Sequence, residues 1–444
     1  MIYISQYKRF ILLFIGVTIL LLMNRVLLVP TPTHADGFPI VGVLHSGKAP
    51  EAMAVDTQTH LLYVAHESPG TLVAFNAVRG QVVWRVTLGD VVTDVQVDSE
   101  SHLVFASVIS YSRKESNLFV LSGSTGQTLA KQPTGFGDNG IALDASRHLV
   151  YVSSSDSGVV AAFTLTGTWH DTATLFSTIQ VKQLHIGPHP QGLGVNSRLG
   201  RLYVADVSEH VLRVLNETTM QVMATLPLAA APLHPVRVDE TTGYVYIVCS
   251  TGQELDVVDG KKNVMIARIP VTPYPEGLSI DTATGRIYIA GEGNNEQGSG
   301  SSTGNTISVL DGKTFQPLGM LRVGAAPDGV ASDADLHRVY VALENSDAVV
   351  EVSDSVNLPL TVNQSLYQSL DAHRAVELLR QASILTALCM LVTFATATAI
   401  AYAANRKRRE LARTSAQERQ RAMESPRTSP SDELSRAEPR SLHS

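Results

Sequence analysis

Residues 56–63 read DTQTHLLY, an aspartate followed seven residues later by a tyrosine. The same pair, an Asp or Asn and then an aromatic residue, occurs seven times in this chain of 444 residues. The seven pairs are Asp56/Tyr63, Asp98/Phe105, Asp144/Tyr151, Asn196/Tyr203, Asp239/Tyr246, Asp281/Tyr288 and Asp333/Tyr340. Their first members lie 42, 46, 52, 43, 42 and 52 residues apart. Such a period is typical of repeat proteins whose units hold about four short strands.

The first unit shows the pattern of strands. Residues 61–65 and 71–76 are rich in β-branched and aromatic side chains and predict two strands. Residues 81–88 predict a third after a turn at Gly80, where glycine tolerates a positive φ. With the strand that ends at Asp56 they make one propeller blade, which must stack on neighbours to bury its faces. The sequence therefore predicts an all-β, seven-bladed β-propeller over residues 36–354.

The two ends of the repeat region predict how the ring closes. Residues 38–51, FPIVGVLHSGKAPE, repeat the pattern of residues 315–328, FQPLGMLRVGAAPD, while the last unit supplies only three strands, through residues 349–352. We expect the N-terminal strand to pair with the last blade as a latch, which removes exposed sheet edges. The alternative places residues 356–362 there, but Pro359 lacks the amide donor of a ladder strand.

Short motifs within the blades carry a family resemblance. They are Tyr63-Val64-Ala65, Tyr151-Val152-Ser153, Tyr203-Val204-Ala205, Tyr340-Val341-Ala342, Pro275-Glu276-Gly277 and Pro327-Asp328-Gly329. Over residues 38–354 the chain resembles the YVTN-type seven-bladed β-propeller repeat family, although no blade holds the full Tyr-Val-Thr-Asn tetrad. The resemblance implies a secreted or surface-layer scaffold, WD40-like in its repeats, that binds other molecules and has no assigned catalytic activity.

The segments outside the propeller predict a membrane protein. Lys8 and Arg9 precede an apolar stretch, and Thr33-His34-Ala35 resembles a cleavage site, so residues 1–35 are interpreted as a signal peptide or a retained signal anchor. Residues 382–404 carry no charge and are long enough for a transmembrane helix. The Arg-rich segment that follows predicts a cytoplasmic C-terminus. We expect an extracellular propeller, a juxtamembrane stalk helix at 355–381 and a disordered cytoplasmic tail at 405–444, with a single pass if the signal is cleaved.

The distribution of charge limits the class of partner. Residues 1–35 carry a net charge of +3 and residues 405–444 carry +4, so the −7 of the whole chain leaves −14 for the rest. An acidic propeller is a poor electrostatic partner for nucleic acid. The two cysteines, Cys249 and Cys389, lie in the predicted propeller and the predicted span, so we expect no disulfide.

A candidate binding site follows from counting along the repeat. The residue five positions before each repeat Asp or Asn falls at the rim of the central channel, and all seven such residues are polar: Glu51, Thr93, Asn139, Gln191, His234, Glu276 and Asp328. Deeper in the channel most blades place a small residue, whereas blade five places Arg237, which either pairs with a rim carboxylate or contacts an anionic ligand. We interpret the rim as a site for a cationic or hydroxyl-rich ligand. The alternative is that these side chains are only solvated.

Loops on the same face extend this candidate site. Residues 108–116 of blade two and residues 291–305 of blade six are predicted insertions between the second and third strands of their blades. Long loops on one face of a rigid ring commonly carry recognition. Blade three places its extra residues, 165–177, on the opposite face.

Motifs for chemistry are scarce. Residues 135–140 match G-x-G-x-x-G, but no helix is predicted after them, and no haem, zinc-protease or serine-hydrolase motif is present. We predict no cofactor, no metal site and no catalytic residue. The sequence favours a membrane-anchored, extracytoplasmic, non-catalytic binding module for a protein, peptide or glycan. The alternative is a metal-dependent propeller hydrolase, lactonase-like, that uses rim carboxylates.

Overall fold

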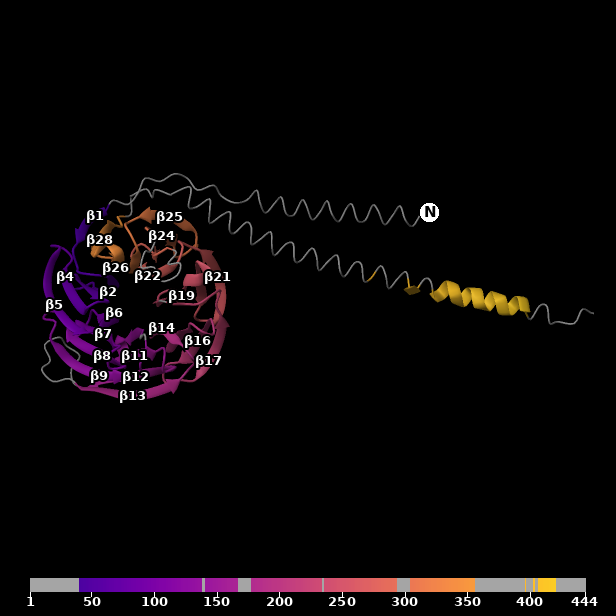
Figure 1. Cartoon of the computed structure of the whole chain (residues 1–444), viewed down its shortest axis with the longest axis horizontal. Helices are drawn as coiled ribbons and strands as arrows, with labels where there is room; N and C mark the ends of the chain where they lie inside the picture. Colours follow the sequence, from indigo (N-terminus) through magenta and orange to yellow (C-terminus); the bar gives the residue numbers. More distant parts are fainter. Residues whose placement is uncertain are drawn as a thin grey trace, which may run out of the picture. The chain divides into compact units, whose positions relative to one another are not determined.

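Seven four-stranded antiparallel sheets form the ring in this computed structural model (Figure 1). The structure describes residues 40–137, 140–166, 177–233, 235–293, 304–355, 396, 402–403 and 406–420. Each sheet runs from an inner strand at the channel to an outer strand at the circumference. The seven-bladed β-propeller predicted from the repeat is confirmed.

The first four blades follow the chain in order. Their strands are β2 (Pro50–Asp56), β3 (Leu61–His66), β4 (Gly70–Asn76) and β5 (Gln81–Gly89); β6 (Val91–Asp98), β7 (Leu103–Ser110), β8 (Glu115–Ser122) and β9 (Thr128–Thr134); β10 (Ile141–Asp144), β11 (Leu149–Ser154), β12 (Val159–Thr166) and β13 (Ser177–His185); β14 (Pro190–Asn196), β15 (Arg201–Asp206), β16 (Val211–Asn216) and β17 (Val222–Pro227).

The remaining three blades complete the circle. Their strands are β18 (Val236–Asp239), β19 (Tyr244–Cys249), β20 (Glu254–Asp259) and β21 (Val264–Pro270); β22 (Pro275–Asp281), β23 (Arg286–Gly291), β24 (Thr306–Asp311) and β25 (Pro317–Arg322); β26 (Pro327–Asp333), β27 (Arg338–Leu343), β28 (Ala348–Ser353) and β1 (Ile40–Leu44). Short 3-10 turns lie at η1 (Ala145–Arg147), η2 (Ser250–Gly252) and η3 (Glu344–Ser346).

The latch is confirmed as well. Strand β1 pairs antiparallel with β28, with Leu44 opposite Val349 and Val43 opposite Val350. The last blade therefore takes its outer strand from the N-terminal side of the propeller. With the ring closed in this way, every inner strand lies between the inner strands of two adjacent blades.

The hydrophobic core lies between neighbouring blades. Seven clusters of buried side chains each join two adjacent sheets, and the repeat aromatics are at most 1% exposed within them. These aromatics are Tyr63, Phe105, Tyr151, Tyr203, Tyr246, Tyr288 and Tyr340. The period of the sequence is therefore the period of inter-blade packing.

The blade-two insertion differs from its prediction. Strands β7 and β8 extend to Ser110 and from Glu115, so most of residues 108–116 belongs to a longer hairpin rather than to a loop. The cause is its β-favouring content, because Val108 and Ile109 are buried and continue the ladder. Blade three likewise lengthens strands β12 and β13 around its extra residues. Much of the predicted blade-six loop lies outside the described residues.

The C-terminal unit, Asp371–Ser444, contains a helix over residues 406–420. The tail was predicted to be disordered, but this part is rich in Arg, Glu, Ala and Gln, which favour helix, and Arg406 pairs with Glu410 one turn later. Within the described residues no helix is long and apolar enough to cross a membrane. The predicted signal segment, the stalk and nearly all of the predicted span at 382–404 lie outside those residues.

Candidate functional site at the mouth of the channel

A cavity occupies the central channel at the end where the inner strands begin. All seven blades line it, and its volume, counted to the open mouth, is about 580 Å³. Four of the predicted rim residues line it, namely Glu51, Thr93, Glu276 and Asp328, and so does Arg237.

Glycines bring the carboxylates of blades six, seven and one side by side. A Cβ built on Gly277 would lie 2.0 Å from the Asp328 carbonyl oxygen, and one on Gly329 would lie 1.9 Å from the Glu51 carbonyl oxygen. Only a residue without a side chain allows the neighbouring blade's backbone to approach so closely. In the Pro-Glu-Gly and Pro-Asp-Gly motifs the acidic residue therefore supplies a rim carboxylate. The glycine after it is where the backbone of the next blade packs.

Burial and like charge act together on the two central carboxylates. Glu276 is 9% exposed. Burial raises its pKa well above the ordinary value, and the nearby Asp328, Glu292 and Glu344 add to the shift. Burial also raises the pKa of Asp328 far above its usual range, with Glu292, Glu344 and Glu67 contributing. Both effects disfavour the charged form of a carboxyl group.

A second set of carboxylates lies beyond the rim. Glu67, Glu292 and Glu344 follow the second strands of blades one, six and seven. Burial raises the pKa of Glu292 to about 6, helped by Glu344 and Glu67. Burial likewise raises the pKa of Glu344, with Glu67 adding to it. We call Glu67, Glu292 and Glu344 the outer carboxylates, and Glu51, Glu276 and Asp328 the inner carboxylates.

The channel wall formed by blades two and five has a different character. Asp94 and Arg237 both line the cavity. Burial raises the pKa of Asp94, against the attraction of Arg237. Burial lowers the pKa of Arg237, and Asp94 opposes that shift. Asp94 also accepts the backbone N–H of Ile141 at 2.8 Å, which links blade two to blade three.

Three predicted rim residues are placed differently or are not described. Gln191 is buried but does not line the cavity, and its carbonyl oxygen accepts the Ser153 hydroxyl at 2.6 Å. Asn139 and His234 lie outside the described residues. The sequence reasoning missed Asp94, Glu292 and Glu344. The outer carboxylates could have been found, because each follows an inner carboxylate by 16 residues.

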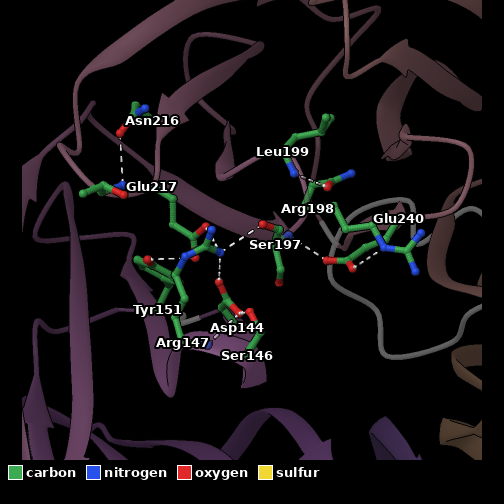
Figure 2. Close-up of polar contacts among 12 residues, drawn as sticks. Asp144, Ser146, Arg147, Tyr151, Ser197, Arg198, Leu199, Asn216, Glu217 and Glu240 are labelled. Carbon is green, nitrogen blue, oxygen red and sulfur yellow. Dashed lines mark hydrogen bonds and ion pairs between the residues drawn. The ribbon is translucent and has the colours of Figure 1, made fainter.

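A second polar cluster lies at the turns after β10 and β16, on the face opposite to the mouth. Figure 2 shows its contacts. Arg147 Nη1 donates to Asp144 Oδ2 at 2.5 Å and to Glu217 Oε2 at 3.0 Å, and the Tyr151 hydroxyl donates to Glu217 Oε1 at 3.2 Å (Figure 2). Burial raises the pKa of Glu217 to about 8, and Asp144 adds to the shift. Burial would raise the pKa of Asp144 too, but hydrogen bonds from Glu217, Ser146 and Arg147 hold it well below its ordinary value. Arg147 and Tyr151 of blade three both contact Glu217 of blade four, so the cluster joins these two blades.

Among the described residues, no three His, Cys, Asp or Glu side chains are arranged to hold a metal ion. Cys249 is fully buried, and burial raises its thiol pKa to about 12, with Asp256 contributing. His66 is also buried, its Nδ1 lies 3.1 Å from the Thr71 carbonyl oxygen, and burial lowers its pKa.

Comparison with known proteins shows the fold alone. No family model matches the chain, and no curated protein matches it by sequence. One chain of a solved structure described as "Crystal Structure of Mitotic Checkpoint Complex" is similar, with a TM-score of 0.53 and 11% identity. The similarity covers 73% of this chain and 91% of that one. It supports the propeller fold.

Proposed function

We propose that this chain is a YVTN-type propeller that binds a protein, peptide or glycan at the channel mouth without turnover. The observation that carries this is the cavity lined by Glu51, Glu276 and Asp328 from three successive blades. A rigid ring presents these side chains at fixed positions, so the site needs little reorganisation to bind. The similar chain comes from a structure described as a complex, which is consistent with this role.

The binding proposal is tested by a triple substitution at the rim. The full-length chain in a non-ionic detergent is screened on peptide and glycan arrays, and Glu51→Ala, Glu276→Ala and Asp328→Ala are then combined. Loss of the bound ligand supports the proposal, and unchanged binding contradicts it. The matched control combines Glu100→Ala, Glu240→Ala and Asp335→Ala in turns on the opposite face, and it should bind as the native chain does.

We further propose that the propeller is extracytoplasmic and tethered to the membrane by residues 382–404. Support comes from the sequence, through the uncharged 23-residue stretch and the cationic cluster that follows it. N-terminal sequencing of the membrane-bound form tests whether the predicted signal at residues 1–35 is cleaved. A terminus at Asp36 indicates a cleaved signal and a single pass, whereas a terminus near Met1 indicates a retained anchor.

The second candidate is a metal-dependent propeller hydrolase. The observation that favours it is that the three inner carboxylates come from adjacent blades, since carboxylate oxygens are ligands for Ca²⁺ and Zn²⁺. In the described residues these side chains are not arranged to hold a metal ion, so they would have to move together to bind one. A metal that binds the folded chain raises its melting temperature by mass action. A Ca²⁺ or Zn²⁺ titration that stabilises the native chain but not the triple rim variant would favour the hydrolase over the binding module.

A further inference from the structure

The carboxylates at the channel mouth form two tiers on three successive blades. Each inner carboxylate is followed 16 residues later by an outer one, in the pairs Glu51/Glu67, Glu276/Glu292 and Asp328/Glu344. The strand register explains the spacing, because Pro50 pairs with His66, Pro275 with Gly291 and Pro327 with Leu343. In each blade the inner carboxylate comes directly after the proline of these register partners. The outer carboxylate comes directly after the residue opposite that proline.

The outer tier is held by the same backbone contact in all three blades. The amide of Glu67 donates to the Ala49 carbonyl at 3.2 Å, that of Glu292 to Tyr274 at 3.0 Å, and that of Glu344 to Ala326 at 3.0 Å. Blades four and five make the equivalent contact through Val207 and Ser250, which are neutral. The six carboxylates are therefore confined to one sector of the mouth, formed by blades six, seven and one.

The Glu276 side chain is an independent sign of a ligand. It is 91% buried and lines the cavity, yet within the described residues no hydrogen bond or ion pair joins its carboxyl group to another side chain or to the backbone. Its electrostatic neighbours are all carboxylates. A buried polar group without a partner costs free energy that a bound cation would recover.

The remaining charged groups around the cavity do not neutralise this sector. Strand β26 contributes Asp328, β2 contributes Glu51, β6 contributes Asp94, and the outer carboxylates come from the ends of β3, β23 and β27. Among the described residues that line the cavity, Arg237 of β18 is the single cation, and its electrostatic partner is Asp94. Glu276, Asp328 and the three outer carboxylates are thus electrostatic neighbours of one another.

We infer that the mouth receives a lysine or arginine side chain of a partner protein, with Glu276 and Asp328 contacting its charged group and the outer carboxylates facing basic residues that flank it. This inference rests on the proposed binding function and names its ligand class. A cation relieves the repulsion among the carboxylates, which a sugar hydroxyl cannot do. The spread of the outer tier over three blades suits a peptide segment with several positive charges better than a small amine.

Binding of such a ligand is linked to protons. Burial and like charge raise the pKa values of Glu276 and Asp328, which favours the protonated form of each carboxyl group. A cation favours the ionised forms, so binding releases protons and weakens as the pH falls. It also weakens as salt is added, since part of the attraction is long-range.

The test uses a hexa-arginine peptide and a hexa-citrulline peptide of the same shape but no charge. Binding to the full-length chain in non-ionic detergent is measured by titration calorimetry in two buffers of different ionisation enthalpy, which reports proton release. We expect the arginine peptide to bind at least tenfold more tightly and to release protons. Combining Glu276→Gln with Asp328→Asn should weaken it at least tenfold and remove most of the proton release, leaving only that from Glu292 and Glu344.

The control combines Glu100→Gln with Asp335→Asn, which removes the same charge from the opposite face and should leave both readouts unchanged. Thermal melting confirms that each variant is folded. Equal binding of the two peptides, or equal loss in both double variants, overturns the inference. If a neutral peptide or glycan binds and depends on the rim while hexa-arginine does not bind, the inference fails and the proposed function stands. If no ligand depends on the rim, both fail.

Discussion

The His102 ring nitrogen Nδ1 lies 2.7 Å from Asp56 Oδ2, which ties the turn of blade two to the turn of blade one. The same contact joins blade one to blade seven, where His60 Nδ1 lies 2.8 Å from Asp333 Oδ2. The other oxygen of Asp56 accepts the backbone amides of Gln58 and Thr59 at 3.0 and 3.3 Å. The repeat aspartate thus shapes its own turn and joins its blade to the next.

Replacing Asp56 by Ala should lower the melting temperature strongly. The change removes the turn contacts and leaves the His102 ring without its buried acceptor, which together cost about 3 kcal/mol. Asp239→Ala is the control, because that carboxylate makes the same turn contacts with Thr241 and Thr242 and no histidine contact among the described residues. It should cost less than half as much, and equal losses would contradict the inter-blade role.

Glu276→Gln should stabilise the propeller at pH 8 and leave its stability nearly unchanged at pH 5. The folded-state pKa of Glu276 is raised above its unfolded value, so the folded chain binds more protons between the two values. Its stability therefore falls as the pH rises through that window. The glutamine carries no charge and removes this fall. Melting curves from pH 5 to pH 8 check it, and a parallel decline in both proteins would count against the raised pKa.

Glu217→Gln should flatten a second part of the stability profile. The folded pKa of about 8 lies above the ordinary value of 4.5, so this group destabilises the fold as the pH rises from about 4.5 to about 8. The amide keeps the shape of the side chain beside Arg147 and Tyr151. Chemical denaturation at pH 5, 7 and 9 measures the effect. A native chain whose stability does not change between pH 5 and pH 9 would contradict it.

Gly329→Ala should destabilise the channel by about 2 kcal/mol or more, because the added Cβ meets a backbone oxygen that cannot move alone. Gly192→Ala, one position past the rim in blade four, is the matched control. There the nearest atom to an added Cβ is a Val236 side-chain carbon at 3.1 Å, which can shift. Similar melting temperatures for the two variants would show that the close approach of blades seven and one is not required.

Much of the fold could be predicted because its signals are local and repeated. The Asp-to-aromatic pairs predicted seven blades, and the aromatics are among the largest fully buried side chains of the described residues. The similarity of residues 38–51 to residues 315–328 predicted the latch, which β1 and β28 form. The longer hairpin of blade two was missed. The residues between Ser110 and Glu115 are polar, and such a tip does not reveal how far the paired strands on either side extend.

The candidate site was predicted in part. Counting from the repeat placed Glu51, Thr93, Glu276 and Asp328 at the cavity, because equivalent positions of a closed ring face one channel. It also placed Gln191 there, but Gln191 does not line the cavity, and its carbonyl oxygen accepts the Ser153 hydroxyl. Asp94 was missed because it stands one residue after the rim position of its blade, where other blades have mostly glycine.

The sequence by itself determined the number of blades, the manner of closure and the ring of rim positions, because each depends on a pattern that recurs about every 42–52 residues. Only the tertiary structure decided how closely the rims of neighbouring blades meet, as at the contact between blades seven and one across the closure. That contact sets blade one beside blade seven, so Glu51 lies against Gly329 although 278 residues separate them. The acidic sector exists because the ring closes, and burial within the ring raises the pKa values of Glu276 and Asp328.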